Sequence, residues 1–301
     1  MTMTQPLIPD GTIAVAFSGG IDSVALVKLL EKTNDLILLH VNHGEESKED
    51  QKAIRNIALE LAHPYKQLQA NLRDFDSQAQ LQSEQMLARR MRYTLLEKAA
   101  EDYDCVALAT GHHQQDVSET VLMQILNGVH PLAITGIPEF RTTDKNLRII
   151  RPLLNCTKQD IQELVGTQKY FQDPENLNSD YTRVRTRRVL QDFENINKDA
   201  SKNLISFLNQ ARELQKDVMD IVPKLTFPFH RSQLPHNDLL LSAALRNLLT
   251  GEEKNTRKIS RSKIQGIVRW IRNGSNGVCL LSRTHEMFMH GGFYLCRKRS
   301  K

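Results

Sequence analysis

The chain has 301 residues, of which 40% are hydrophobic and 25% charged, a composition typical of globular domains rather than disordered chains. No apolar run approaches the ~20 residues of a membrane-spanning helix, and the N-terminus lacks the pattern of a secretory signal. The four cysteines are far apart, which excludes a Cys-x-x-Cys metal site and favours a reducing cytoplasm.

The charge is unevenly divided between the two halves of the chain. Residues 1–150 carry 14 basic and 20 acidic side chains, a net charge of −6, whereas residues 151–301 carry 26 and 15, a net charge of +11. A strongly basic half attracts polyanions, of which nucleic acid is the first candidate. We therefore predict two domains, over residues 1–195 and 196–301, the second mostly helical and in contact with nucleic acid.

Apolar runs and helical periodicities alternate along the first half of the chain. In order, we predict strands over residues 12–17, 36–41 and 105–110, and helices over residues 21–31, 48–62, 78–100 and 116–126. This order is typical of an α/β fold in which a parallel sheet carries helices on both faces. Further along, we predict helices over residues 160–168, 189–221, 239–249 and 259–271, and two strands, 278–281 and 293–296, that form a small terminal hairpin.

The segment Ser18–Ser23 (SGGIDS) follows the first predicted strand and opens a helix. Glycines let the backbone approach an anion closely, and free N–H groups at a helix N-terminus bind phosphate. Asp22 would repel phosphate unless it holds Mg²⁺ against it. The alternative is a tight turn in which Asp22 and Ser23 only cap the helix. Neither a G-x-x-x-x-G-K-[ST] nor a G-x-G-x-x-G pattern occurs, which excludes a P-loop and disfavours a dinucleotide site.

This segment resembles the pyrophosphate-binding loop of the N-type ATP pyrophosphatases, the PP-loop superfamily that splits ATP into AMP and pyrophosphate. Within that superfamily, the chain resembles the tRNA(Ile)-lysidine synthases over most of its length. The resemblance implies an adenine nucleotide alpha hydrolase-like, Rossmann-like catalytic domain. ATP would bind through Ser18, Gly19, Gly20, Ile21, Asp22 and Ser23.

Residues 40–44 (HVNHG) are similar to the family's H-V-N-H segment, which follows the second strand. The resemblance places Val41 and Asn42 against the nucleotide, at the carboxyl edge of the sheet where ligands bind in such folds. The alternative is a strand end with polar residues.

Two arginine motifs extend the resemblance. Residues 88–93 (ARRMRY) resemble the family's A-R-x-x-R-Y helix, whose Arg89 can neutralise the pyrophosphate leaving group. The alternative is a solvated basic helix face. Residues 150–154 (IRPLL) match the family's R-P-L-L, and the alternative is a strand entering a turn with Arg151 in solvent.

Residues 111–120 (GHHQQDVSET) resemble the family's G-H-H-x-D-D-x-x-E-T. Asp116 and Glu119 lie three residues apart at a helix start, so both carboxylates can face one point and hold Mg²⁺ or an ammonium group. His112, at the end of a strand, is placed to orient the reacting oxygen. The alternative is that the acids simply favour the N-terminal end of a helix.

Residues 173–176 (DPEN) and 181–188 resemble the family's D-P-S-N and F-x-R-N-R-I-R stretches. Such a dense cationic patch binds phosphates in a salt-sensitive way, here those of tRNA or ATP. A lone run of charge is more often a solvated helix face. The arginines that keep the family register are Arg183, Arg185, Arg187 and Arg188.

The chain also departs from the family pattern. A Leu-Arg pair is missing before Glu45, and Gln115 replaces the first of two aspartates. The family's R-G-[ST]-G segment is replaced by residues 127–130 (NGVH), so Asn127 and His130 put any role of that loop in question.

The resemblance implies a cytoplasmic ligase of tRNA processing that uses ATP and Mg²⁺, with the metal at Asp22 and Asp116. Its partners would be free L-lysine and the isoleucine tRNA with a CAU anticodon, whose wobble cytidine becomes lysidine through an adenylated intermediate. The proposed catalytic residues are Asp22, Arg89, His112, Asp116 and Glu119. The resemblance leaves room for a homodimer and gives no role to a membrane.

Two other functions stay open from the sequence. A small-molecule amide or amine ligase would share the ATP chemistry but would not need the basic half. An inactive RNA-binding relative would explain the departures at Gln115, Asn127 and His130. The lack of a Cys pair argues against the tRNA thiolases of the same superfamily.

Overall fold

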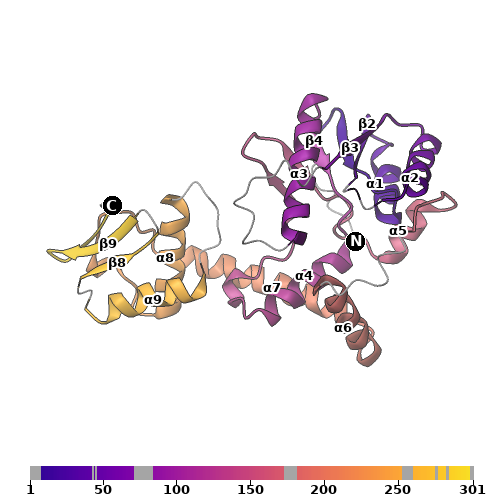
Figure 1. Cartoon of the computed structure of the whole chain (residues 1–301). Helices are drawn as coiled ribbons and strands as arrows, with labels where there is room; N and C mark the ends of the chain where they lie inside the picture. The colour runs from indigo at the N-terminus through magenta and orange to yellow at the C-terminus, as the bar shows by residue number, and fades with distance from the viewer. Residues whose placement is uncertain are drawn as a thin grey trace. The chain divides into compact units, whose positions relative to one another are not determined.

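The computed structural model describes residues 8–42, 44, 46–70, 84–172, 182–252, 260–274, 277–282 and 285–298 (Figure 1). Nothing is described of the side chains of residues 84–86, 182, 183, 250–252 and 261. The chain divides into two compact units. The first contains residues 1–123 and 135–205, and the second contains residues 124–134 and 206–301.

A six-stranded sheet forms the centre of the first unit, in the order β3-β2-β1-β4-β6-β5. Neighbours are parallel except that β5 runs antiparallel to β6. The strands are β1 (Ile13–Ala16), β2 (Leu36–Asn42), β3 (Tyr65–Gln69), β4 (Ala107–Ala109), β5 (Phe140–Thr142) and β6 (Arg148–Ile150). The helices are α1 (Ile21–Leu30), α2 (Lys48–Glu60), α3 (Glu84–Asp102), α4 (Gln114–Leu126), α5 (Lys158–Val165) and α6 (Thr182–Ile196).

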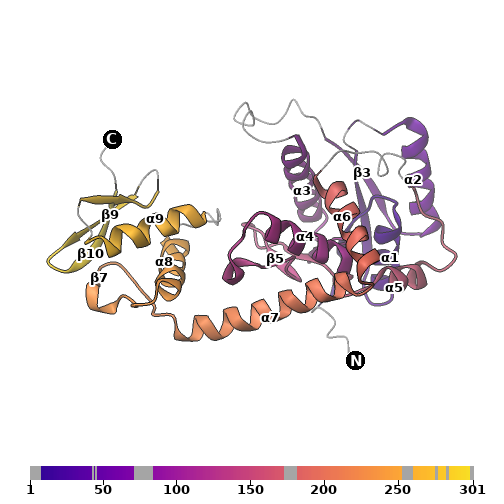
Figure 2. The same ribbon diagram turned by 90° about the horizontal axis from the view of Figure 1, so that it is seen from below.

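Helices cover both faces of this sheet because successive residues of a strand point to opposite sides. Ile13 and Val15 of β1 belong to a core that includes buried residues of α1, α2 and α5. Ala14, between them, belongs to a second core with buried residues of α3. Figures 1 and 2 show α3 on one side of the strands and α1 and α5 on the other. The predicted α/β sheet with helices on both faces is confirmed.

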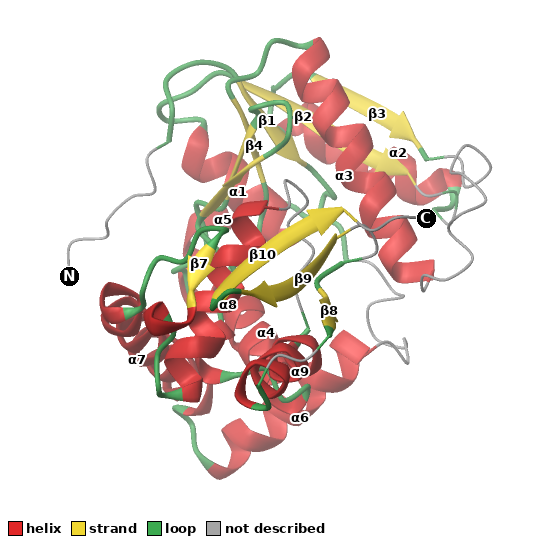
Figure 3. Cartoon of the chain, turned by 90° about the vertical axis from the view of Figure 1, so that its left-hand side faces the viewer, coloured by secondary structure: helices red, strands yellow, loops and turns green. Residues whose placement is uncertain are grey.

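The second unit combines helices with a four-stranded antiparallel sheet in the order β7-β10-β9-β8 (Figure 3). The core of this unit contains Phe229 and Tyr294, whose stacked rings are 5.0 Å apart. The strands are β7 (Phe229–His230), β8 (Val278–Leu280), β9 (His285–His290) and β10 (Phe293–Lys298). The helices are α7 (Ala200–Ile221), which begins in the first unit, α8 (Asp238–Glu252) and α9 (Arg261–Arg272), and two short 3-10 helices are Pro131–Ala133 and Arg231–Gln233.

Several elements differ from the prediction in detail. The two predicted terminal strands exist as β8 and β10, but each pairs with β9, which forms from the polar stretch between them. Strands β3 and β5 were not predicted, and β6 appeared only in the alternative of a strand entering a turn at residues 150–154. The contacts divide the chain between Ile205 and Ser206, inside α7, whereas we predicted a boundary at residue 195, and residues 124–134 join the second unit. Among the described residues, no helix is long and apolar enough to cross a membrane.

Candidate functional site

The direction in which strands are added to the sheet reverses at β1. The chain adds β2 and β3 on one side of β1 and then places β4 and β6 on the other. Ligands in open α/β sheets bind outside the carboxyl ends of the strands at such a switch point. The loop after β1 and the loop after β4 meet there. A Cβ atom on Gly111 would lie only 3.2 Å from the carbonyl oxygen of Asp22, so glycine is what lets the two loops approach.

Glycines shape the loop between β1 and α1. Gly19 has a φ of +75°, and its carbonyl accepts a hydrogen bond of 2.8 Å from the Phe171 N–H. Gly20 is the N-cap of α1, and no side chain caps that helix end. Ser23 donates instead to the Gly20 carbonyl at 2.8 Å. The capping alternative for Asp22 and Ser23 is therefore not what the loop forms, and the helix N-terminus has the character of an anion site.

His113 joins the loop after β4 to the start of α1. Its Nε2 atom lies 3.8 Å from Asp22 Oδ1 and 3.8 Å from Asp116 Oδ2. At the N-terminus of α4, the His113 N–H donates to Asp116 Oδ2 at 3.0 Å, and its Nδ1 accepts from the Gln115 N–H at 3.2 Å. Because Nδ1 is an acceptor, the ring proton belongs on Nε2, the atom that faces both carboxylates. Asp116 therefore supports the helix start and also lies beside Asp22.

The electrostatics of Asp22 are dominated by its partial burial. Burial raises its pKa above the ordinary value, and the nearby Asp116 carboxylate adds to the increase. The charges of His113, Arg187 and Lys158 oppose it. A carboxylate with a raised pKa beside a second carboxylate is an environment in which a cation is favourable.

Glu119 is the most buried acid of the region, since its side chain has no solvent exposure. Its Oε1 atom accepts a hydrogen bond of 2.7 Å from Arg187 Nε on α6. Although burial lowers the pKa of Arg187, the hydrogen bond and charge of Glu119, with Asp116 and Asp22, raise it above the ordinary value. Arg187 is thus anchored to the carboxylate cluster, although its side chain as a whole is 42% exposed.

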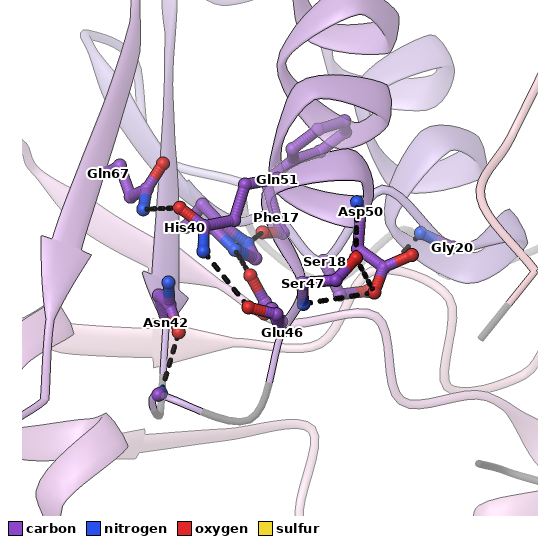
Figure 4. Close-up of polar contacts among 11 residues, drawn as sticks. Phe17, Ser18, Gly20, His40, Asn42, Glu46, Ser47, Asp50, Gln51 and Gln67 are labelled. Carbon is purple, nitrogen blue, oxygen red and sulfur yellow. Dashed lines mark hydrogen bonds and ion pairs between the residues drawn. The ribbon is translucent and has the colours of Figure 1, made fainter. Parts of the chain in front are cut away.

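A second polar network lies at the end of β2 (Figure 4). The His40 ring is buried, and its Nδ1 lies 2.9 Å from the Phe17 carbonyl oxygen, one residue before the glycine loop. Its Nε2 lies 2.9 Å from Glu46 Oε2. Because both ring nitrogens have partners, the His40 ring is fixed in place beside the first residues of that loop. Its ring also stacks on Tyr65, and burial, with the Glu46 charge, raises the pKa of Tyr65 to about 12.

The remaining predicted nucleotide residues also lie at this edge of the sheet. Val41 and Asn42 are buried at the end of β2, and Asn42 Oδ1 accepts from the Gly44 N–H at 2.6 Å. His112 Nδ1 lies 2.9 Å from the Thr110 hydroxyl. The His43 part of the H-V-N-H segment lies outside the described residues.

The predicted arginines separate into different environments. Arg89 does not join Asp22 and Asp116 in any contact among the described residues, and instead its guanidinium carbon lies 5.1 Å from the centroid of the Tyr93 ring. Arg185 and Arg188 are exposed on α6, unlike the anchored Arg187. Arg151 is 5% exposed, which overturns the alternative that placed it in solvent. The side chain of Arg183 and the 173–181 loop lie outside the described residues.

The residues fit a Mg²⁺ ion that is held jointly with a nucleotide. Within the described ranges, no group of three or more His, Cys, Asp or Glu side chains could hold a metal alone. Mg²⁺ usually takes one or two carboxylates and completes its shell with substrate phosphates and water. The partly buried Asp22, with its raised pKa and the neighbouring Asp116, matches that donor set beside the glycine loop.

Sequence reasoning missed the roles of four members of the site. His113 follows His112 in the motif, and the doubled histidine was the available signal. Lys158, which begins α5, carries no local signal. The HVNHG motif marked His40, but its pairing with Glu46 could not be predicted, because both roles depend on where separate segments meet.

Comparison with known proteins places the site in context. The family model described as "PP-loop domain" matches residues 2–194. A tRNA(Ile)-lysidine synthase of Bacillus cereus is 35% identical over 189 residues, which cover 60% of this chain and 39% of that protein. A tRNA(Ile)-lysidine synthase of Streptococcus gordonii is 31% identical over 221 residues, which cover 71% of this chain and 49% of that protein. The chain thus spans less than half the length of these curated relatives.

Among solved structures, the U34-tRNA thiolase NcsA from Methanococcus maripaludis superposes with a TM-score of 0.53 at 21% identity. The match covers 68% of this chain and 72% of that one. At this identity, the likeness supports the shared Rossmann-like fold alone.

Proposed function

Because this chain belongs to the PP-loop domain family, we propose that it ligates lysine to the wobble cytidine of a CAU-anticodon isoleucine tRNA at the expense of ATP. The observation that carries the proposal is the meeting of the uncapped α1 N-terminus with the carboxylates of Asp22 and Asp116, 3.8 Å from the His113 ring. The names of the relatives supply the substrate class.

In the first step, the cytidine O2 atom attacks the α-phosphorus of ATP, and the bond to pyrophosphate breaks. The phosphates lie on residues 18–23, where backbone N–H groups and the helix dipole stabilise negative charge. The products are an adenylated cytidine and pyrophosphate. Asp22 and Asp116 would hold Mg²⁺ together with the phosphates, and the ion would supply charge neutralisation at this centre.

In the second step, the ε-amine of lysine attacks C2 of the activated cytidine, and AMP leaves with the O2 atom. The attacking ammonium must first lose a proton. Asp116, at the N-terminal end of α4 beside Asp22, would hold that ammonium and accept the proton. Glu119 holds Arg187 in place nearby through their hydrogen bond. No covalent enzyme intermediate is required.

The tRNA would be gripped by basic side chains outside the nucleotide loop. Arg185 and Arg188 are exposed on α6, and the chain beyond residue 150 has a net charge of +11. The cytoplasm remains the proposed location, because the four cysteines form no disulfide among the described residues. A homodimer also remains a proposal.

The direct test incubates the protein with ATP, Mg²⁺, labelled lysine and a CAU-anticodon tRNA(Ile) transcript. We expect lysine incorporation into the tRNA with release of AMP and pyrophosphate. A methionine tRNA transcript and an ATP-free reaction are the controls. ATP binding without incorporation would favour the small-molecule ligase, and absence of ATP binding would favour the inactive RNA-binding relative.

A further inference from the structure

A basic pocket of about 460 Å³ lies in the first unit, and no residue of the glycine loop lines it. Four arginines contribute to its wall, against one acidic side chain, Glu97, which binds Arg141 at 2.9 Å. The lining residues are Arg89, Arg90, Tyr93, Thr94, Glu97, Arg141 and Arg151.

Among the described residues, the deepest guanidinium of this pocket has no carboxylate partner. Arg151 is 5% exposed, and its Nη1 donates to the Pro138 carbonyl at 2.8 Å. Its Nε is buried without a hydrogen-bond partner. Burial lowers the pKa of Arg151, and the charges of Arg141 and Arg89 add to the decrease, whereas the charge and hydrogen bond of Tyr93 oppose it. Three cations therefore lie close together with Glu97 as the one acidic side chain in the lining, and a bound anion would stabilise this arrangement.

Tyr93 holds the outer arginines in place before any ligand arrives. The guanidinium carbons of Arg89 and Arg141 each lie 5.1 Å from the centroid of its ring, within the range of a cation–π interaction. The ion pair with Glu97 restrains Arg141 further. Arginine forks fixed in this way are suited to the planar, multidentate recognition of phosphate oxygens.

The position of the pocket favours an RNA backbone over the ATP phosphates. Arg151 follows directly on β6, which β4 separates from β1. Adjacent strands are about 4.8 Å apart, so the carboxyl ends of β1 and β6 are roughly 10 Å apart. If the base to be modified lies at the glycine loop, the neighbouring RNA backbone would extend over about this distance and reach the pocket. The phosphates of ATP, in contrast, are already assigned to the glycine loop itself.

We propose that this arginine pocket binds a backbone phosphodiester of the RNA substrate, flanking the nucleotide that is modified. The inference rests on the proposed function, because it takes a tRNA as the substrate. It adds Arg90, Arg141 and Arg151 as substrate-binding residues at a place that is separate from the ATP loop.

The test measures binding of a CAU-anticodon tRNA(Ile) transcript as a function of salt, with ATP affinity measured in parallel. Arg141→Gln should weaken tRNA binding about tenfold, since a hydrogen bond to a charged group is lost, and should reduce the salt slope by about 1. Arg90 is exposed, so Arg90→Gln should have little effect on folding. This variant should also weaken tRNA binding and reduce the salt slope. The ATP affinity should stay unchanged in both variants.

The matched control is Arg148→Gln. Arg148 belongs to the same strand, β6, but lies over the Phe140 ring outside the pocket, so tRNA affinity should be retained. Wild-type affinity and salt slope in both pocket variants would overturn the inference while leaving the proposed function intact. Weaker binding of ATP or pyrophosphate in place of tRNA would overturn it too, by assigning the pocket to the nucleotide. A wild-type protein that binds no tRNA would overturn both.

Discussion

The carboxylate of Glu119, with no solvent exposure, accepts a 2.7 Å hydrogen bond from Nε of Arg187, 68 residues further along the chain. This ion pair fastens α6 to α4 and places a cation beside Asp22 and Asp116. One arginine of the basic run is therefore a positioning residue of the acidic site, whereas its neighbours are exposed on the same helix.

The first prediction concerns that ion pair. Arg187→Gln leaves a buried carboxylate without its cation, and because Arg187 is partly exposed we expect a loss of about 1–3 kcal/mol of unfolding free energy. Arg185→Gln, two residues earlier on an exposed position, should leave stability unchanged and weaken tRNA binding. Urea unfolding and tRNA titration of both variants measure the contrast. Equal stability of the two would contradict the role given to Arg187.

The second prediction concerns the protonation of Asp22. Its folded-state pKa is raised, so its contribution to stability is present in full below the ordinary value of 3.8 and is lost as the pH rises through the folded-state pKa. Asp22→Asn should thus be as stable as the wild type at pH 7 or more so. Turnover should nevertheless be abolished, because the cation near the phosphates loses a ligand.

The same shift predicts the acid side of the pH profile for Mg²⁺-ATP binding. Affinity should fall as the pH drops towards the raised pKa of Asp22, above 3.8, because the protonated carboxyl no longer attracts the cation. Calorimetric titration between pH 7 and pH 4 checks this. An Asp22→Asn variant with wild-type turnover, or an affinity independent of pH in that range, would refute the role of Asp22.

The third prediction concerns the helix cap at α5. Thr157 and Asp160 form a capping box, and the hydrogen bonds from Thr157 lower the pKa of Asp160. This contribution to stability is present above pH 3.8 and is lost as the pH falls through the lowered folded-state pKa. Thr157→Ala should cost about 1 kcal/mol at pH 7, and the cost should shrink in acid. If the stability difference between the wild type and Thr157→Ala stayed constant with pH, the coupling between Thr157 and Asp160 would be contradicted.

The fourth prediction tests the close approach of the two loops. Gly111→Ala would put a methyl group 3.2 Å from the Asp22 carbonyl oxygen, so the backbone of the glycine loop must shift by a few tenths of an ångström. We expect turnover to fall about tenfold, since small misplacements of reacting groups are costly. Gly266→Ala in α9, where a Cβ meets nothing within 4 Å, is the matched control and should stabilise by about 0.5–1 kcal/mol.

Local sequence patterns were sufficient for the central strands and their helices. β1 and β2 are continuous apolar runs because both faces of the sheet are covered, and the SGGIDS segment encodes an uncapped helix start. β3 (YKQLQ) escaped prediction because an edge strand is only partly buried and carries polar residues. β5 (FRT) and β6 (RII) escaped because each contains an arginine and only one or two apolar residues, whereas β4, equally short, lies in the apolar run of residues 105–109.

The sequence by itself therefore determined the fold class and the helix start at which Asp116 lies, whereas phosphate binding by residues 18–23 stays a prediction. Only the tertiary structure decided which side chains meet. Asp22 with His113, Glu119 with Arg187, and the convergence of Arg141 and Arg151 on Tyr93 each join segments far apart in the chain. The physical reason is that hydrogen bonds and charges act over a few ångströms, and residue spacing predicts such distances only within one helix or strand.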